Sequence, residues 1–217
     1  VYPKSNAEQM KLLKAFKDLS GLNKILIAMG DYGVPFRILS PRLGSYISFT
    51  SLKNDGAAPG HVPLNDMVNL YRFHSIDEKT MIFGVIGNPV MHTLSPLIHN
   101  TGFKKLSINA VYLPFIVDNL EEFFKICQIL DIYGLSVTVP YKEKVISFLS
   151  NFDDSVSSIG ACNTIYRCGD SWCGTNTDWS GFLAPLEKRL GSKLPGGKRA
   201  TVIGAGGAAR AVVYALV

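Results

Sequence analysis

The amino-acid sequence predicts an α/β fold, and three observations lead to that prediction. Short apolar runs that end at or beside a glycine, such as residues 24–29 and 81–87, are typical of buried strands. These runs alternate with segments whose apolar residues recur at helical spacing. A glycine-rich turn at residues 204–207 stands between one apolar run and a final helical segment. Strand–helix alternation of this kind indicates α/β packing.

Composition limits the functions that the chain can have. The 217 residues are 47% hydrophobic and 18% charged, as in an ordinary globular protein. Their 22 Lys plus Arg and 17 Asp plus Glu give a net charge of +5, spread evenly along the chain. Without a basic stripe, nucleic acid is not an expected partner, whereas a small anionic substrate is. No uncharged run of about 18 apolar residues occurs, so no membrane partner is expected either.

The four cysteines predict neither a metal site nor a disulfide framework. Cys127, Cys162, Cys168 and Cys173 have no CxxC spacing and no histidine cluster nearby, so reduced thiols are expected. The sequence shows no signal-peptide pattern, which favours a cytoplasmic location. The chain starts at Val1 without an initiator Met, so it is either processed or part of something longer. Its oligomeric state is left open.

The first 80 residues predict a short alternation of elements followed by a linker. Asn6 opens a segment in which Met10, Leu13 and Phe16 recur at helical spacing, with Ser5 or Asn6 as its N-cap. Apolar runs predict strands at 24–29 and 45–50, a short helix is expected at 64–71, and the polar stretch 72–80 is the best linker candidate.

Residues 81–217 predict a longer series of elements. Strands are expected at 81–87, 110–115, 133–139, 163–167, 171–174 and 200–204, and helices at 96–105, 120–130, after Asp178 as N-cap, and at 208–217. A turn-rich connector is expected at 191–199.

The turn after residue 203 has the spacing of a dinucleotide-binding fingerprint. In G-x-G-G-x-A, one glycine permits the tight turn, the next allows a close approach to a pyrophosphate, and the helix start offers free N–H groups. The candidate cofactor residues are Gly204, Ala205, Gly206, Gly207 and Ala208. A purely structural turn is the alternative. The residue that selects NAD or NADP is expected about 20 positions further on, past Val217.

Two hydroxyls near the end of the strand at 81–87 are candidates for binding a carboxylate. Thr93 and Ser95 stand two residues apart in a loop stiffened by Pro89 and Pro96. The spacing alone favours a different role, in which Ser95 caps a helix that begins with Pro96.

Three further residues stand at the ends of predicted elements. Lys142 follows an apolar strand and Pro140, where a solvated lysine is the commoner case. Asn163 and Asp178 stand in G-A-C-N-T and G-T-N-T-D, and each alone is as easily a turn or cap residue. Their combination with the glycine-rich turn and the Thr93–Ser95 pair favours a functional role for these residues.

Residues 82–217 resemble shikimate dehydrogenase. The motifs G-N-P-V-x-H-T-x-S-P, S-V-T-V-P-Y-K, G-A-C-N-T, N-T-D and G-A-G-G-A-A occur in that family's order. The resemblance implies a substrate-binding α/β sheet and the first β-α of a Rossmann domain, with NADPH-dependent reduction of 3-dehydroshikimate to shikimate. It also implies roles: Thr93 and Ser95 bind the substrate carboxylate, Thr138, Asn163 and Asp178 hold ring hydroxyls, and Lys142 and Asp178 form the catalytic pair. The family usually has Ser at the place of Thr93, so quinate against shikimate preference stays open.

Residues 1–71 resemble the end of a type I 3-dehydroquinate dehydratase, a TIM barrel. M-G-D-Y-G-V-P-F-R matches the family segment with a carboxylate-binding arginine, here Arg37. G-A-A-P-G-H matches a substrate loop, although Ala57 and His61 replace Ser and Gln. The family's Schiff-base lysine would stand just before Val1. Only the last two of eight strands are expected, too few to close a barrel.

Together the two resemblances imply part of a bifunctional dehydratase–dehydrogenase. The expected domains are a barrel end at 1–74, a substrate-binding domain at 80–190 and a truncated nucleotide-binding start at 199–217. Two alternatives remain: a quinate-preferring dehydrogenase, and a substrate-binding fragment without catalysis.

Overall fold

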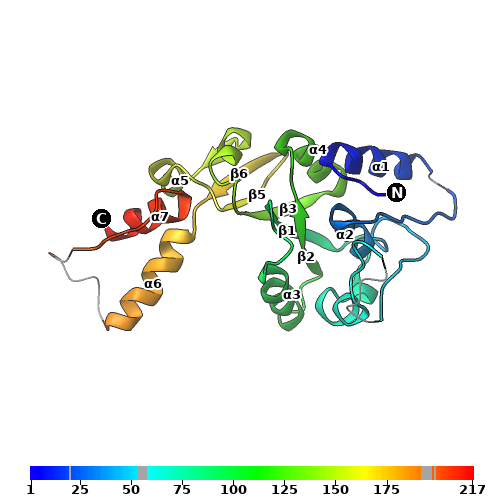
Figure 1. The fold of residues 1–217 in the computed structure, drawn as a ribbon, viewed down its shortest axis with the longest axis horizontal. Helices are drawn as coiled ribbons and strands as arrows, with labels where there is room; N and C mark the ends of the chain where they lie inside the picture. The colour runs from blue at the N-terminus through cyan, green and yellow to red at the C-terminus, as the bar shows by residue number, and fades with distance from the viewer. Residues whose placement is uncertain (20, 53–57, 192–196, 198) are drawn as a thin grey trace. The chain divides into compact units, whose positions relative to one another are not determined.

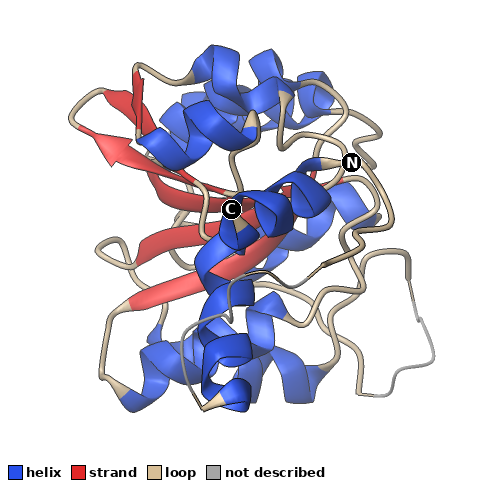
Figure 2. Ribbon diagram, turned by 90° about the vertical axis from the view of Figure 1, so that its left-hand side faces the viewer, coloured by secondary structure: helices blue, strands red, loops and turns tan. Residues whose placement is uncertain are grey.

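The computed structural model describes residues 1–217 except Ser20, 53–57, 192–196 and Lys198. The chain divides into two compact units, Val1–Leu135 and Ser136–Val217, and the boundary falls within strand β3 (Ile132–Val137). Helices and strands alternate in each unit, which confirms the predicted α/β fold (Figures 1 and 2).

In the first unit, two parallel strands form the centre. Strands β1 (Met81–Gly87) and β2 (Ala110–Ile116) pair from Met81↔Ala110 to Gly87↔Ile116, and the strand order is β2-β1-β3. Gly84 allows the close approach, because a Cβ there would lie 2.5 Å from the carbonyl oxygen of Leu113. Almost every residue of β2 is buried, as expected for a parallel strand.

Helices α3 (Ser95–Lys105) and α4 (Leu120–Leu130) follow β1 and β2 in sequence, near their predicted bounds. The buried side chain of Asn100 fixes α3 to β2, since it donates to the Tyr112 carbonyl and accepts from the Tyr112 amide, both at 2.9 Å. Asn119 caps α4 by accepting from the Glu122 amide.

Helix α1 (Asn6–Asp18) packs along α4 (Figure 1). Ser5 is its N-cap and accepts from the Glu8 amide. The fully buried Asn6 side chain donates to the carbonyl of Ile116 and accepts from the amides of Asp118 and Asn119. This network joins the residues that resemble a dehydratase to those that follow β2.

The expected strands at 24–29 and 45–50 do not form, which corrects the prediction. Both segments are extended, but they share only a few bonds, such as Tyr46 N–H to the Lys24 carbonyl at 2.8 Å. Ile25 and Tyr46 are exposed, and the two segments form no regular ladder among the described residues. The other elements here are short: 3-10 helix η1 (Asp31–Gly33), α2 (Val34–Ile38), π-helix η2 (Asp66–Leu70) in the range of the helix expected at 64–71, and 3-10 helix η3 (Phe73–Ser75).

Residues 72–80 are not a free linker. The Arg72 guanidinium donates to the Ala110 carbonyl at 2.7 Å, and the buried Thr80 hydroxyl lies within hydrogen-bond distance of Asn109 Oδ1 at 2.8 Å and Asp77 Oδ1 at 2.9 Å. Polar side chains in this stretch therefore hold the backbone against β2. A polar composition alone does not distinguish such a stretch from a linker.

The second unit is built on an antiparallel hairpin. Strand β5 (Thr164–Cys168) pairs with β6 (Ser171–Thr175) from Thr164↔Thr175 to Cys168↔Ser171. The two-residue strand β4 (Asn151–Phe152) runs parallel to β6, so the order is β5-β6-β4. Its described helices are two short ones, 3-10 helix η4 (Lys144–Phe148) and α5 (Asp154–Ile159), and two longer ones, α6 (Asp178–Leu190) and α7 (Gly207–Leu216).

Several features of the second unit differ from expectation. Cys168 and Cys173 form a disulfide across the hairpin, so the prediction of reduced thiols is wrong for these two, while Cys127 and Cys162 are buried thiols outside any disulfide. The strand expected at 200–204 does not form, because a parallel strand needs a neighbour and the described residues supply none. Most of the connector at 191–199 lies outside the described residues. Neither β4 nor α5 was expected.

Helices α6 and α7 lie side by side in Figure 1. In the part of the chain that the structure describes, no helix is long and apolar enough to span a bilayer.

Candidate active site

Lys142 and Asp178 form an ion pair in the second unit. The Lys142 Nζ atom lies 2.6 Å from Asp178 Oδ2, and the two side chains are 19% and 29% exposed. Lys142 stands in the turn after β3, and Asp178 is the first residue of α6. The pair is therefore half-sheltered, yet both groups stay accessible to a small molecule.

Asn163 joins this pair from the hairpin. Its side-chain amide donates to Asp178 Oδ1 at 2.8 Å and to Thr177 Oγ1 at 3.0 Å, and its oxygen accepts from the Thr177 amide at 2.9 Å. Asn163 precedes β5 and Asp178 comes shortly after β6, so the hairpin holds both at its open end. Two of the predicted residues, Lys142 and Asn163, thus both bind the carboxylate of the third, Asp178.

Backbone bonds place these residues beside one another. The Cys162 amide donates to the Lys142 carbonyl at 2.7 Å, which fixes the turn of Lys142 against the start of β5. Thr138 begins that turn, and its carbonyl accepts from the Tyr141 amide at 2.9 Å.

Asn176 also positions the site, although it was not among the predicted site residues. This buried side chain donates to the Ala161 carbonyl at 2.7 Å and accepts from the Asp178 amide at 3.0 Å. The expectation that Asp178 caps α6 is wrong, because Thr177 is the cap residue and the Asp178 carboxylate faces Lys142 and Asn163. Its place as the first residue of the N-T-D motif was the signal available for Asn176.

The glycine turn lies next to Lys142. Gly204 has φ +116°, a conformation that favours glycine, and Gly206 precedes α7 without a side-chain cap on the helix N-terminus. A Cβ at Gly207 would lie 2.9 Å from the Ala161 Cβ and 3.5 Å from the Lys142 Cδ.

A pocket of about 520 Å³ lies at this turn. A pocket of this volume can hold part of a small ligand. Lys142, Gly206, Gly207, Ala208 and Ala209 are among its lining residues. Free helix N–H groups and closely packed glycines beside a cation fit an anionic phosphate group. Ala205 lies in the exposed turn itself.

In the first unit, Thr93 and Ser95 hydrogen-bond each other. The Thr93 hydroxyl donates to Ser95 Oγ at 3.0 Å and accepts from the Ser95 amide at 3.2 Å. The favoured interpretation of Ser95 as a helix cap is wrong, because Ser95 is the first residue of α3 and Leu94 is the cap residue. The two hydroxyls instead form a polar pair in front of the helix.

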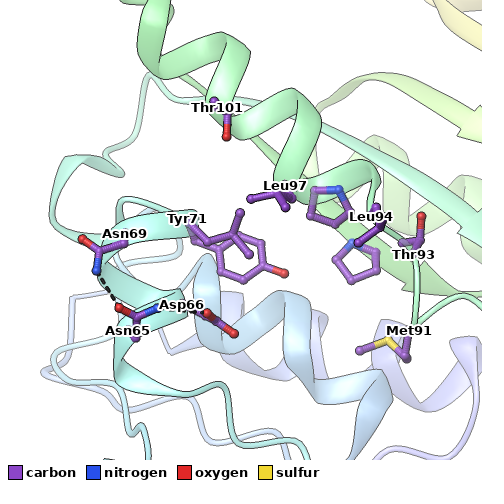
Figure 3. Close-up of a pocket in the computed structure, with 12 residues that line it drawn as sticks. Asn65, Asp66, Asn69, Tyr71, Met91, Thr93, Leu94, Leu97 and Thr101 are labelled. Carbon is purple, nitrogen blue, oxygen red and sulfur yellow. Dashed lines mark hydrogen bonds between the residues drawn. The ribbon is translucent and has the colours of Figure 1, made fainter.

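Thr93 also lines a pocket of about 470 Å³ in the first unit (Figure 3). Tyr71 and Asp66 line it from the segment that resembles the dehydratase, and Leu97 lines it from α3. Burial, together with the charge of Asp66, raises the pKa of Tyr71 to about 12. The Tyr71 phenol is therefore neutral at physiological pH.

Arg37 is buried in α2, with 2% of its surface exposed. Its Nη1 lies 3.5 Å from the Phe49 carbonyl oxygen, and its Nε has no partner among the described residues. Burial and the positive charge of Arg37 lower the pKa of His61. The loop position Ala57 lies outside the described residues.

Two family models match successive parts of the chain. The family model of the shikimate dehydrogenase substrate binding domain matches residues 85–165, and that of type I 3-dehydroquinase matches residues 1–78. Both predicted resemblances are confirmed, in the predicted order.

Individual proteins agree with these matches. The chain is 37% identical over 202 residues to the chloroplastic bifunctional 3-dehydroquinate dehydratase/shikimate dehydrogenase of Arabidopsis thaliana, covering 87% of this chain and 34% of that protein. It is 45% identical over 143 residues to the shikimate dehydrogenase (NADP(+)) of a Nostoc species, covering 64% and 48%. A crystal structure of a shikimate dehydrogenase in complex with NADP+ superimposes with a TM-score of 0.61 at 39% identity, covering 64% and 49%. The chain therefore spans between a third and a half of the length of these relatives.

Proposed function

We propose that this chain carries the substrate-binding part of an NADP-linked shikimate dehydrogenase, which interconverts 3-dehydroshikimate and shikimate. The observation that carries the proposal is the Lys142–Asp178 pair at 2.6 Å beside the glycine turn. Its support includes relatives named shikimate dehydrogenase (NADP(+)).

Lys142 is proposed to be the proton donor. When bound, the reduced nicotinamide supplies a hydride to the carbonyl carbon of the substrate. The Lys142 ammonium gives a proton to the carbonyl oxygen as negative charge develops there, so that one C–H and one O–H bond replace the C=O π bond. Asp178 orients the amine through its Oδ2 atom. Because Asp178 Oδ1 is bonded to Asn163, the carboxylate is held from both sides.

The remaining site residues are proposed to bind the substrate ring. Asn163 and Asp178 offer an amide and a carboxylate to ring hydroxyls, with Thr138 at the start of the same turn. The adjacent hydroxyls of Thr93 and Ser95 suit a carboxylate, which accepts two hydrogen bonds readily. The methyl group of Thr93 is the feature that bears on shikimate against quinate preference.

The cofactor is proposed to dock at the glycine turn. Gly204, Ala205, Gly206, Gly207 and Ala208 would face the pyrophosphate, with α7 behind it. NADP is proposed as the cofactor, since sequence relatives are named shikimate dehydrogenase (NADP(+)) and a structurally similar dehydrogenase was crystallised with NADP+.

The segment that resembles a dehydratase is proposed to be inactive as a lyase in this chain. Arg37 keeps the expected cation, but Ala57 and His61 replace two polar groups of the family loop. The domain bounds 1–74, 80–190 and 199–217 and a cytoplasmic location stay predictions, and the Arabidopsis relative is chloroplastic.

The test is a paired measurement on the 217-residue chain. Calorimetry with shikimate and with quinate measures binding, and loss of NADPH absorbance with 3-dehydroshikimate measures turnover. Binding of shikimate supports the proposal, and turnover in addition shows that this chain also holds a working cofactor site. Shikimate binding without turnover favours a substrate-binding fragment, stronger binding of quinate favours the quinate enzyme, and binding of neither acid overturns the assignment.

A further inference from the structure

Arg210 connects three segments of the second unit. Its Nη2 atom lies 2.6 Å from Glu143 Oε1 and donates to the Gly160 carbonyl at 3.3 Å. Arg210 belongs to the first turns of α7, directly after the glycine turn, and Glu143 directly follows Lys142. One guanidinium thus links the helix behind the glycine turn to the lysine loop and to the end of α5.

The contact at Gly160 fixes the third segment. Gly160 ends α5 with φ +66°, and a Cβ there would lie 3.5 Å from Arg210 Nη1. Two residues later, the Cys162 amide bonds the Lys142 carbonyl. Arg210 therefore reaches the backbone of Lys142 by two routes, one through Glu143 and one through residues 160–162.

The start of α7 also packs on the lysine itself. The closest groups to a Cβ built on Gly207 are the Ala161 Cβ at 2.9 Å and the Lys142 Cδ at 3.5 Å. Ala211, one turn further along α7, is fully buried against Ile159 and Ala161. A shift of α7 therefore moves the surface against which the Lys142 side chain rests.

We propose that the Arg210–Glu143 ion pair is a positioning clasp that sets the Lys142 amine relative to the glycine turn. The side chains of Arg210 and Glu143 are 38% and 59% exposed, and exposed pairs contribute little to folding stability. The pair acts on placement instead. Neither residue contacts the substrate ring in this assignment, and the kinetic part of the test rests on the proposed function.

The first experiment measures Lys142 directly and needs no cofactor. Arg210→Gln and Glu143→Gln are compared with the wild-type chain by pulsed acylation of lysine amines and peptide mass spectrometry. Removal of the clasp is expected to raise the acylation rate of Lys142 several-fold relative to Lys144, because the amine leaves Asp178 more often. Lys125→Gln removes an exposed ion pair within α4 and serves as the matched control, with no expected change at Lys142.

The second experiment measures turnover. Both variants are expected to lower kcat by about 10- to 100-fold, as displacement of a catalytic group by about 1 Å does, while the KM for 3-dehydroshikimate changes little. The double variant Glu143→Arg with Arg210→Glu restores the ion pair in reverse and is expected to recover part of the rate. Thermal unfolding of all variants is expected to match the wild type.

The outcomes separate the clasp from the proposed function. Wild-type acylation of Lys142 in both single variants, with unchanged unfolding, overturns the clasp whatever the rates are. A wild-type chain without turnover counts against activity of this chain, and the acylation rates alone then decide the clasp. Faster acylation of Lys142 in both variants, reversed in the double variant, supports it.

Discussion

The side-chain amine of Lys142 lies 2.6 Å from the Asp178 carboxylate, although 36 residues separate them in sequence. The turn after β3 brings one partner and the β5–β6 hairpin brings the other. A contact of this kind depends on the pairing of strands, so it reports that the second unit is folded as well as where its chemistry lies.

Replacement of Lys142 by alanine is expected to lower turnover by roughly 10²–10⁴-fold, because the proton donor is lost. Shikimate affinity should change less, since Asn163 and Asp178 remain. Steady-state rates and calorimetry measure the two effects. Lys144→Ala, an exposed lysine two residues away, is the control and should leave both unchanged.

Asp178→Asn is expected to weaken both substrate binding and rate. The amide keeps the shape of the carboxylate but gives up the charge that holds Lys142, and it presents an NH₂ group to one of two donors. Calorimetry with shikimate should show the lower affinity. A variant that binds as well as wild type would separate Asp178 from substrate contact.

The Asp153 carboxylate is expected to give the stability of the second unit a pH dependence. Burial acts to raise the pKa of Asp153, but hydrogen bonds from Ser155, Thr175 and Val156 outweigh it and hold this pKa below 3.8. A lowered pKa in the folded state means stability that is present above the ordinary pKa and lost as pH falls through the lowered one.

Asp153→Ala should therefore lower the free energy of unfolding by about 1 kcal/mol at pH 7, as loss of an N-cap does. The difference from wild type should shrink as the pH falls through the lowered pKa of Asp153. Urea unfolding at several pH values measures it. A constant difference down to that pH would mean that the carboxylate charge plays no part.

Cysteine accessibility is expected to follow the disulfide. In denaturant without reductant, a thiol reagent should label Cys127 and Cys162 only, and Cys168 and Cys173 should react after reduction. In the native chain Cys162 should react slowly, because burial raises the pKa of its thiol to about 11, so only about a thousandth is thiolate at pH 8. Labelling of all four cysteines without reductant would show that Cys168 and Cys173 are not joined by a disulfide.

Asn6→Ala is expected to destabilise the first unit by about 2–4 kcal/mol, because it leaves two backbone amides and a carbonyl without their buried partner. Thermal or urea unfolding measures the loss. Lys11→Ala, an exposed residue of the same helix, is the control. An effect as small as that of the control would show that the two resembling segments are not held together by Asn6.

The sequence predicted most elements of residues 81–190, because these strands and helices have strong apolar periodicity and local caps. It predicted strands wrongly at 24–29 and 45–50, since an apolar run describes a tendency while a strand requires a neighbour to bond. The same reason applies to residues 200–204.

Within the candidate site, the order of the motifs predicted Lys142, Asn163 and Asp178 correctly as neighbours. Local capping rules, however, predicted the wrong role for two site residues. Asp178 and Ser95 each look like a helix cap by position, yet both side chains bond elsewhere. Asn176 was not predicted because its partner Ala161 stands 15 residues away in the sequence, while its bond from the Asp178 amide is an ordinary local turn contact.

The β5–β6 hairpin separates its turn from the site. Residues 169–170 form the turn, and Asn163 and Asp178 lie at the opposite, open end. Lengthening the turn should leave the open end unchanged, because the paired residues between them keep their register. Deleting one residue from either arm shifts the pairing beyond the deletion by one residue and turns every side chain of that segment to the opposite face. Natural length variation in this hairpin should therefore gather at its tip, leaving the arms invariant in length.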